Sequence, residues 1–163
     1  MPPPTRCDNA TDRGRSMPEG WCYAVGVGSN LGDRHAIIAA GRALLDAGGI
    51  GTVVAASELI ETAPVGGPGG QGAFLNGVWI VASTFGPHQI LAELQRIEAR
   101  CGRVRTVHWG PRTLDLDLLL RDDGLVMSSA VLTLPHPRIA ERPFVLIPLS
   151  QVTNCWPAPG HPA

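Results

Sequence analysis

The sequence predicts one α+β domain, in which an antiparallel sheet has helices packed on one of its faces. Three observations support this prediction. The length of 163 residues suits a single domain. Two segments have the apolar repeat of a helix, and four have the β-branched or apolar pattern of a strand. Their order is strand, helix, strand, strand, helix, strand, which is typical of a ferredoxin-like βαββαβ core.

The first three elements lie within residues 21–57. Residues 21–28 are mostly apolar and predict a strand. Residues 33–47 predict a helix, because apolar residues mark one broad side and a pair of glycines follows the last turn. Asp33 or Asn30 could cap this helix. Residues 52–57 are rich in β-branched side chains and predict the second strand.

A loop and the next two elements follow. Residues 63–74 predict a loop, because six of the seven residues from 66 to 72 are Gly or Pro. Residues 74–83 predict the third strand. Residues 87–101 give the clearest helix, since Pro87 suits the first turn, one apolar stripe follows, and Gly102 ends the pattern.

The last part of the domain alternates loops with short elements. Residues 103–113 predict a second long loop, and residues 113–120 predict the fourth strand. Its leucines at 114, 116, 118 and 120 are expected to share a face that packs in the core. Further on, the sequence predicts a short strand at 131–134, a turn at 135–137 and a short helix at 144–149.

Both ends are expected to lie outside the domain, which should span residues 21–152. Residues 1–20 are polar and rich in Pro and Arg, without the apolar core of a secretory signal, and predict a disordered arm. Met17 is an alternative start, in which case residues 1–16 are not native. Residues 153–163 are Pro-rich and predict a frayed tail.

Composition excludes several classes of protein. The net charge of −1 gives no general attraction to nucleic acid, and no apolar run is long enough to cross a membrane. All thirteen basic residues are Arg, which excludes the lysine of a P-loop, a pyridoxal Schiff base and a lysine nucleophile. Residues 100–163 carry seven of these Arg, which favours an anionic ligand. The four Cys form no Cys-x-x-Cys pair, and reduced thiols in a cytoplasmic protein explain them most simply.

Asp115 and Asp117 interrupt the apolar run GPRTLDLDLLL at 110–120. Residues two apart in a strand point the same way, so both carboxylates are expected on one face. Two neighbouring carboxylates repel, and something positive must lie between them. An Mg²⁺ ion and a structural ion pair with a nearby Arg both meet this need, and a solvent-facing strand edge is a further alternative. The Arg residues on either side of the pair favour a phosphoryl-transfer site.

Other motifs have two interpretations each. The stretch VGVGSNLG at 25–32 has glycines at 26, 28 and 32, a spacing that departs from a dinucleotide-binding turn; a tight turn with a helix cap is the alternative. His136 lies between two prolines and is either structural or a donor to phosphate. Trp109 either packs under its loop or closes over a ligand. Phe74 and Phe144 are most simply core residues by composition.

The segments VGVGSNLGDR, ETAPVG…FLNGV, RIEARCGRVR…WGPRTLDLDLLL and LPHPRIAERPFVLIPL together resemble the 6-hydroxymethyl-7,8-dihydropterin pyrophosphokinase family. The resemblance runs from about Tyr23 to Leu149, and WGPRTLDLD is its most specific part. It implies a ferredoxin-like fold. It also implies transfer of the β,γ-pyrophosphoryl group of ATP to the hydroxymethyl oxygen of the pterin, leaving AMP, in tetrahydrofolate biosynthesis.

The resemblance further implies residue roles. Asp115 and Asp117 would hold two Mg²⁺ ions and would act in catalysis with Arg103 and Arg112. The positions implied to contact ATP are Gln95, Glu98, Arg103, Arg105, Trp109, Arg112, Leu118, Thr133, His136 and Arg142. The positions implied to contact the pterin are Gly28, Thr62, Ala63, Val65, Phe74, Asn76, Asp115 and Phe144, with the two Phe rings on opposite sides of the pterin. The expected protein is a monomer whose partners are these two small molecules, with no nucleic acid and no membrane.

The chain departs from this pattern in places. Residues 103–109 are one residue shorter than in some members, with His108 where a basic residue is often found. Two other function classes stay open. A nicotinamide-dependent oxidoreductase would rest on Gly26 and Gly28 but leaves the Asp pair unexplained. A ferredoxin-like RNA-binding module would need a basic sheet face, which the charge of −1 disfavours.

Overall fold

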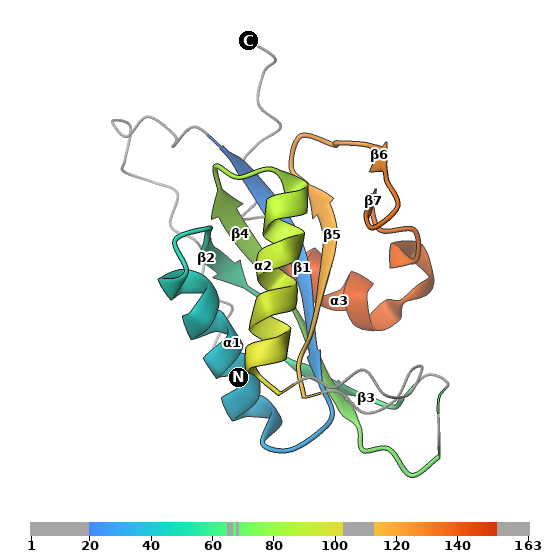
Figure 1. Ribbon diagram of the computed structural model, residues 1–163. Coiled ribbons are helices and arrows are strands. Elements are labelled where there is room, and N and C mark those ends of the chain that lie inside the picture. The colour runs from blue at the N-terminus through green and yellow to red at the C-terminus, as the bar shows by residue number, and fades with distance from the viewer. Residues whose placement is uncertain (1–19, 65–66, 68, 103–112, 153–163) are drawn as a thin grey trace, which may run out of the picture.

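A computed structural model describes residues 20–64, 67, 69–102 and 113–152 of the chain. Its main sheet has the strand order β2–β4–β1–β5, with β3 alongside β4, and every pair is antiparallel (Figure 1). The strands are β1 (Trp21–Ser29), β2 (Thr52–Ala56), β3 (Ile60–Thr62), β4 (Phe74–Ser83) and β5 (Asp115–Arg121). Helix α1 (Arg34–Ala47) follows β1, and α2 (Pro87–Arg100) follows β4. The ferredoxin-like α+β class is therefore confirmed.

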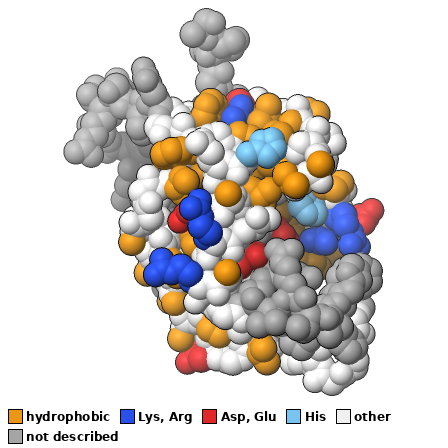
Figure 2. Space-filling model, in the orientation of Figure 1, with side chains coloured by type: hydrophobic (Ala, Val, Ile, Leu, Met, Phe, Trp, Pro, Cys, Tyr) orange, Lys and Arg blue, Asp and Glu red, His pale blue; other side chains and the backbone are white. Residues whose placement is uncertain are grey.

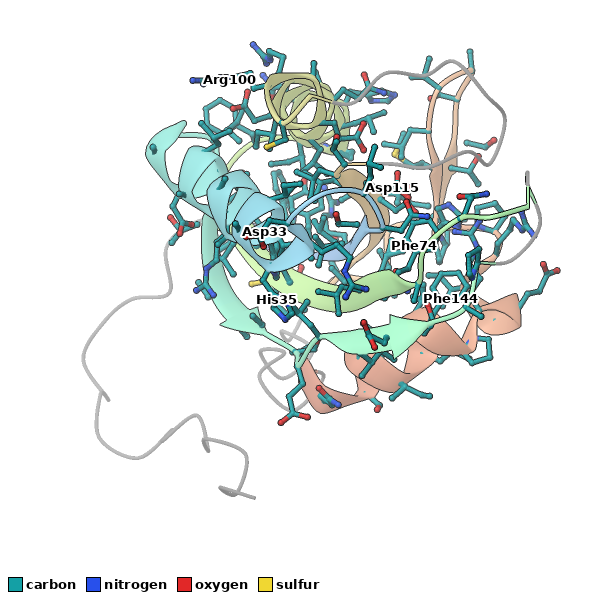
Figure 3. All side chains as sticks on the ribbon, turned by 90° about the horizontal axis from the view of Figure 1, so that it is seen from below. Asp33, His35, Phe74, Arg100, Asp115 and Phe144 are labelled. Atoms are coloured by element: carbon teal, nitrogen blue, oxygen red, sulfur yellow. The ribbon has the colours of Figure 1, made fainter. Side chains whose placement is uncertain are left out.

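Helices cover both faces of this sheet. Helices α1 and α2 lie on one face, and α3 (Pro143–Val152) lies on the other (Figures 1 and 3). Neighbouring residues of β1 therefore enter different cores: Val25 packs with the first two helices and Ala24 packs with α3. The expectation that the helices lie on one face holds for α1 and α2 and is wrong for α3. A sheet buried on both faces explains why its strands read as continuous apolar runs.

The ends of the two long helices follow the chemistry expected from sequence. Of the two candidate caps of α1, Asp33 is the one used, and its Oδ1 accepts a hydrogen bond from the Ala36 N–H at 3.1 Å. Pro87 is the first residue of α2, where its missing N–H leaves no hydrogen bond broken. After α2, Gly102 adopts φ +81°, a conformation that L side chains rarely accept.

Strand β3 was not expected from sequence. The chain bends between β2 and β3, and there Leu59 lies over Gly77 of β4, where a Cβ would meet the Leu59 Cδ2 atom at 2.8 Å. The missing side chain of Gly77 leaves room for this bend. Strand β3 then pairs with the first residues of β4, so that Thr62 lies opposite Phe74.

The fourth core strand also differs from the prediction at one end. Leu114, Leu116 and Leu118 pack in the core under α1 and α2, as expected, but Leu120 packs on the α3 side. The cause is a bulge: Val25 pairs with Leu118 and Ala24 with Leu120, so Leu119 is an extra residue. Beyond the bulge, the side chains of β5 exchange faces.

The C-terminal part forms a small unit beside β5. It contains the hairpin β6 (Met127–Ser128) and β7 (Thr133–Leu134), a 3₁₀ turn at Ile139–Glu141, and α3. Only the second half of the expected strand at 131–134 is paired. Helix α3 is longer than the expected 144–149, although Pro148 lies inside it. Its sequence is apolar on most sides, so it lacks the periodicity by which a helix boundary is recognised.

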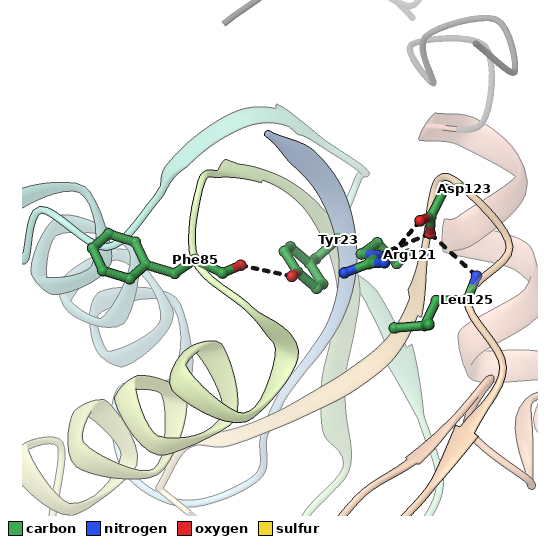
Figure 4. A network of polar contacts seen from close by, with 5 residues as sticks. All are labelled: Tyr23, Phe85, Arg121, Asp123 and Leu125. Atoms are coloured by element: carbon green, nitrogen blue, oxygen red, sulfur yellow. Dashed lines mark hydrogen bonds and ion pairs between the residues drawn. The ribbon is translucent and has the colours of Figure 1, made fainter. Parts of the chain in front are cut away.

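A polar network ties the far end of the sheet together (Figure 4). The Tyr23 hydroxyl donates to the Phe85 carbonyl at 2.7 Å, and Arg121 binds both carboxylate oxygens of Asp123 at 2.8 and 2.7 Å. The guanidinium of Arg121 also lies 4.3 Å from the centre of the Trp21 ring. The hydrogen bonds from Arg121 lower the pKa of Asp123. These contacts fix the chain segments that follow β4 and β5, at the end of the sheet away from Asp115.

The described part of the chain includes no helix with the length and hydropathy that crossing a bilayer requires. The expected N-terminal arm at 1–20, apart from Gly20, and the expected C-terminal tail at 153–163 lie outside the described residues.

We expect Tyr23→Phe to lower the free energy of unfolding by about 1–3 kcal/mol, because the carbonyl of Phe85 would lose its donor. Tyr23 is the only tyrosine of the chain and is fully buried. Phenylalanine differs from it only by the hydroxyl group, so the packing of the ring is retained. Urea unfolding followed by tryptophan fluorescence measures the change. An unchanged midpoint and slope would show that the hydrogen bond contributes nothing to stability.

Candidate functional site

The two aspartates of β5 lie opposite two glycines of β1. Asp115 pairs with Gly28 and Asp117 pairs with Gly26. Paired residues in antiparallel strands share a face, so the sheet surface beside both carboxylates is bare backbone. The two glycines lie inside β1, paired with β4 on one side and β5 on the other. They therefore do not form the strand-to-helix turn of a dinucleotide-binding motif.

The two glycines differ in how much room surrounds them. A Cβ on Gly26 would make ordinary contacts, at 3.6 Å or more, with Leu119 and Asp117. A Cβ on Gly28 would meet the Oδ1 atom of Asn76 at 2.9 Å. Asn76 is 9 % exposed, and its Nδ2 donates to the Thr62 hydroxyl at 2.6 Å. Gly28 therefore leaves the space in which the Asn76 amide is held.

The described candidate residues line one cavity of about 690 Å³. Those implied to contact the pterin are Gly28, Thr62, Ala63, Phe74, Asn76, Asp115 and Phe144, and those implied to contact ATP are Gln95, Glu98, Leu118, Thr133, His136 and Arg142, together with Asp117. Val65, Arg103, Arg105, His108, Trp109 and Arg112 lie outside the described residues. The described residues that the resemblance implies come from seven separate segments of the chain, and the fold places them around one cavity.

The cavity extends around the outer edge of β5. Asp115 and Asp117 line it from one face of the strand, and Leu116 and Leu118 line it from the other. On the Asp face it continues between β4 and the start of α3; on the Leu face it continues between α2 and the β6–β7 hairpin. In Figure 3, Asp115, Phe74 and Phe144 lie together, away from Arg100 at the end of α2 and from Asp33 and His35 at the start of α1. The Asp pair is at the junction of the two parts.

Cationic side chains come to the Asp pair from the segment before α3. Arg142 lies with its Nη1 atom 3.6 Å from Oδ2 of Asp117, and its guanidinium is 5.8 Å from the centre of the Phe144 ring. Arg138, on the same segment, forms an ion pair with Glu141 at 3.5 Å. Figure 2 shows basic, acidic and histidine side chains gathered around a hollow on this side of the molecule. An anionic ligand in the cavity would meet positive charge beside the carboxylates.

His136 is held in place by its own backbone and by its ring. Its N–H donates to the Leu119 carbonyl at 2.6 Å, and its Nδ1 accepts from the Arg138 N–H at 3.2 Å. The neutral ring therefore carries its proton on Nε2 and can donate from that atom. Burial lowers the pKa of His136, as do the charges of Arg142 and Arg138, against a smaller opposite effect of Asp115.

The donor set near Asp115 suits Mg²⁺ better than a transition metal. Among the described residues there is no group of three or more His, Cys, Asp or Glu that could hold a metal ion. Mg²⁺ is usually held by one or two carboxylates together with water and phosphate oxygens. Two carboxylates on one strand face, over backbone without side chains, fit that ion.

The loop at 63–73 is tied to the start of α1. The Asn30 side-chain amide donates to the Gln71 side chain at 3.1 Å and to the Gly72 carbonyl at 3.3 Å. Arg34 donates to the Ala73 carbonyl at 2.9 Å and to Glu61 at 2.6 Å. These bonds hold the end of the loop that leads into Phe74.

Some lining residues were not expected from the sequence. Gly26 lies opposite Asp117, and residues 129–132 of the β6–β7 turn form part of the wall beside α2. The two-residue strand β6 is too short for a periodic pattern, so nothing in the sequence placed this turn near Gln95. The glycine could have been found from the register of two strands, if their pairing had been known.

Comparison with known proteins gives one consistent family. Residues 24–154 match the family model described as 7,8-dihydro-6-hydroxymethylpterin-pyrophosphokinase (HPPK). Proteins named 2-amino-4-hydroxy-6-hydroxymethyldihydropteridine pyrophosphokinase are similar to the chain. Those of Bacillus subtilis and Methylorubrum extorquens are each 40% identical over 128 residues, which is 78% of this chain and 75% and 80% of theirs. That of Mycobacterium tuberculosis is 44% identical over 134 residues, covering 76% of this chain and 68% of its own.

We expect the imidazole of His136 to titrate below the ordinary pKa of 6.5 in the ligand-free protein. The unfolded chain then takes up this proton at a higher pH than the folded chain. Stability should consequently be full above pH 6.5 and fall as the pH decreases from there through the lowered pKa. Proton NMR titration measures the pKa, with His136→Gln to assign the resonance. A His136 pKa at or above 6.5 would contradict this account of its burial and charges.

Proposed function

The chain belongs to the 7,8-dihydro-6-hydroxymethylpterin-pyrophosphokinase family, and on that premise we propose how its cavity performs the reaction. The reaction is transfer of a pyrophosphoryl group from ATP to the hydroxymethyl group of a dihydropterin, in folate biosynthesis. The proposal adds the use of two Mg²⁺ ions and assigns the substrates to the two parts of the cavity. The observation that carries it is the pair Asp115 and Asp117 at the junction of those parts, over Gly28 and Gly26.

The pterin is proposed to bind on the sheet face between β4 and α3. Phe74 and Phe144 line this part of the cavity, and two aromatic rings can stack on the faces of a flat heterocycle. The Asn76 amide lies above Gly28 and can hydrogen-bond the edge of the ring. The hydroxymethyl group would then point toward Asp115. Thr62 holds the amide in orientation, and Ala63 and Val65 belong to the adjoining loop.

ATP is proposed to occupy the part of the cavity beside the β5 edge. Gln95, Leu118 and Thr133 line the region that we assign to the nucleoside. Arg142 and His136 lie nearer the carboxylates and can donate to phosphate oxygens. The guanidinium of Arg142 makes no hydrogen bond with a described residue, so its donors are available to an anion. Arg103, Arg105, Trp109 and Arg112, from the loop outside the described residues, complete the proposed set.

Asp115 and Asp117 are proposed to hold the two Mg²⁺ ions. When bound, the ions would neutralise the charge that builds up on the phosphates during transfer. The chain itself orients the carboxylates through the β1 register and supplies Arg142 as a further cation. The closeness of the two substrates at the Asp pair is the main contribution of the fold, because phosphoryl transfer depends chiefly on positioning and charge stabilisation. We also propose a cytoplasmic monomer; light scattering after size-exclusion chromatography tests the monomer.

The reaction is tested by mixing the purified protein with ATP, Mg²⁺ and 6-hydroxymethyl-7,8-dihydropterin and separating the nucleotides by chromatography. AMP that forms only when the pterin is present supports pyrophosphoryl transfer. ADP in place of AMP would show that a single phosphoryl group is transferred and would overturn the substrate arrangement. The same assay with EDTA tests the need for a divalent cation.

We expect Asp115→Asn and Asp117→Asn each to lower turnover by at least about 100-fold, because a neutral amide oxygen is a weaker ligand of Mg²⁺ than a charged carboxylate. The side chains keep their shape, so the thermal unfolding midpoint should change little. AMP formation at saturating substrates measures the effect. The matched control is Asp123→Asn near the other end of β5, which removes the ion pair with Arg121 and one of its two acceptors and should lower stability with AMP formation retained. Wild-type turnover in either test variant would overturn the metal assignment.

We expect Gly28→Ala to weaken pterin binding about tenfold, because the added methyl group displaces Asn76 and breaks its hydrogen bond to Thr62. Gly26→Ala is the matched change on the same strand, and its methyl group makes only ordinary contacts. Its effect on pterin affinity should be clearly smaller. Quenching of protein fluorescence by the pterin in the presence of a non-hydrolysable ATP analogue measures both. Equal losses in the two variants would contradict the role given to Asn76.

A further inference from the structure

Strand β5 is an edge strand of the described sheet, so only one side of it is paired with a neighbouring strand. In an antiparallel pair, successive residues direct their backbone N–H groups alternately toward and away from the partner. The Leu116 N–H points away from β1, because it donates to a side chain of α2. The flanking residues Asp115 and Asp117 therefore direct their N–H groups toward β1. The outer edge between the two carboxylates needs another partner.

Glu98 of α2 is that partner. Its Oε1 accepts the Leu116 N–H at 2.7 Å, and the residue is only 3 % exposed. Its neighbours Ile97 and Leu94 are fully packed in the core, which fixes the helix face from which the carboxylate projects. Burial of a carboxyl group is costly, and the hydrogen bond from the strand backbone offsets part of that cost.

The rest of the outer edge is held in a similar way. The His136 N–H donates to the Leu119 carbonyl at 2.6 Å, at the bulge that ends the regular part of β5. The segment from Leu116 to Leu119 is therefore fixed at both ends, and Asp117 lies between the two points. Together with β1 on the inner side, these bonds hold the backbone of both aspartates from two directions.

We propose that Glu98 is a positioning residue, which fixes the separation and orientation of Asp115 and Asp117 by binding the backbone between them. The proposal rests on the function proposed above for the two aspartates. It differs from a direct contact with ATP, because the carboxylate acts on the strand and not on the nucleotide. Mg²⁺ requires nearly ideal octahedral geometry, so a small movement of one carboxylate lowers its affinity. Loss of a residue that supports metal ligands commonly costs 10- to 100-fold in affinity or activity.

Three variants of α2 test the proposal. Glu98→Ala removes the acceptor, Glu98→Gln keeps a carbonyl oxygen in its place, and Gln95→Ala changes the lining residue one turn earlier. Two measurements need no turnover: hydrogen exchange of the Leu116 amide, and binding of Mn²⁺ as a spectroscopic substitute for Mg²⁺. The third measurement is kcat and KM for ATP as a function of Mg²⁺ concentration.

For Glu98→Ala we expect Leu116 exchange to be at least about tenfold faster and Mn²⁺ binding to be about 10- to 100-fold weaker. Turnover should fall more than the affinity for ATP. Glu98→Gln should restore most of the exchange protection and metal affinity. Gln95→Ala should leave Leu116 exchange and Mn²⁺ affinity as in the wild type, whatever it does to the KM for ATP. If Glu98→Ala does not fold, Glu98→Asp withdraws the acceptor by one methylene and should show the same effects.

Wild-type Leu116 exchange and Mn²⁺ affinity in Glu98→Ala would overturn the proposal. A second result would also overturn it: equal rises in the KM for ATP in Glu98→Gln and Glu98→Ala, with no other measured quantity changed. That result would show that the Glu98 carboxylate contacts the nucleotide. Tyr23→Phe supplies the control for general loss of stability and should leave Mn²⁺ affinity unchanged. If the wild-type protein makes no AMP, the function proposed above fails, whereas the exchange and Mn²⁺ results still decide the role of Glu98.

Discussion

The antiparallel pairing of β5 with β1 is the constraint on which the rest of the site depends. Two carboxylates a few ångströms apart repel each other on any sheet face and need positive charge beside them, and the glycines at the opposing positions of β1 leave space for it. Larger side chains on β1 would fill the space next to Asp115 and Asp117 and leave no room for a cation or a substrate. The register, rather than either sequence motif alone, therefore makes the site.

The edge position of β5 is the second constraint. A strand inside the sheet could offer a ligand only its two faces, whereas an edge strand lets one cavity reach both faces. The two substrates of a transfer reaction can then approach the same carboxylates from different sides. An edge strand is also the least restrained part of a sheet, because its outer backbone groups lack a neighbouring strand. Glu98 and the backbone of His136 supply that restraint without a further strand, and so leave the edge accessible to ligand.

The fold class could be predicted from sequence because the two long helices have a clear periodic pattern of apolar residues and typical capping or terminating residues at their ends. The placing of Asp115 and Asp117 on one strand face also follows from a period of two. Other features depended on distant contacts. The bulge that turns Leu120 to the α3 side arises from pairing with β1, and α3 itself has no amphipathic pattern. The bond between Glu98 and Leu116 links residues 18 apart, and no local rule identifies it. The resemblance implies that Glu98 contacts ATP and says nothing of its hydrogen bond to the Leu116 N–H.

All basic residues of the chain are Arg, and Arg142 shows why a guanidinium suits this site better than a lysine ammonium. Its planar guanidinium lies near the Asp117 carboxylate and near the face of the Phe144 ring at the same time. A lysine ammonium is a compact and strongly hydrated charge and lacks the planar set of donors with which a guanidinium can bind an anion beside an aromatic ring. Arg142 thus connects the charged part of the cavity with its aromatic part. In the function proposed above, the pyrophosphoryl group passes from the nucleotide to the pterin at this junction, and a cation that lies near both parts is suited to stabilise the charge during transfer.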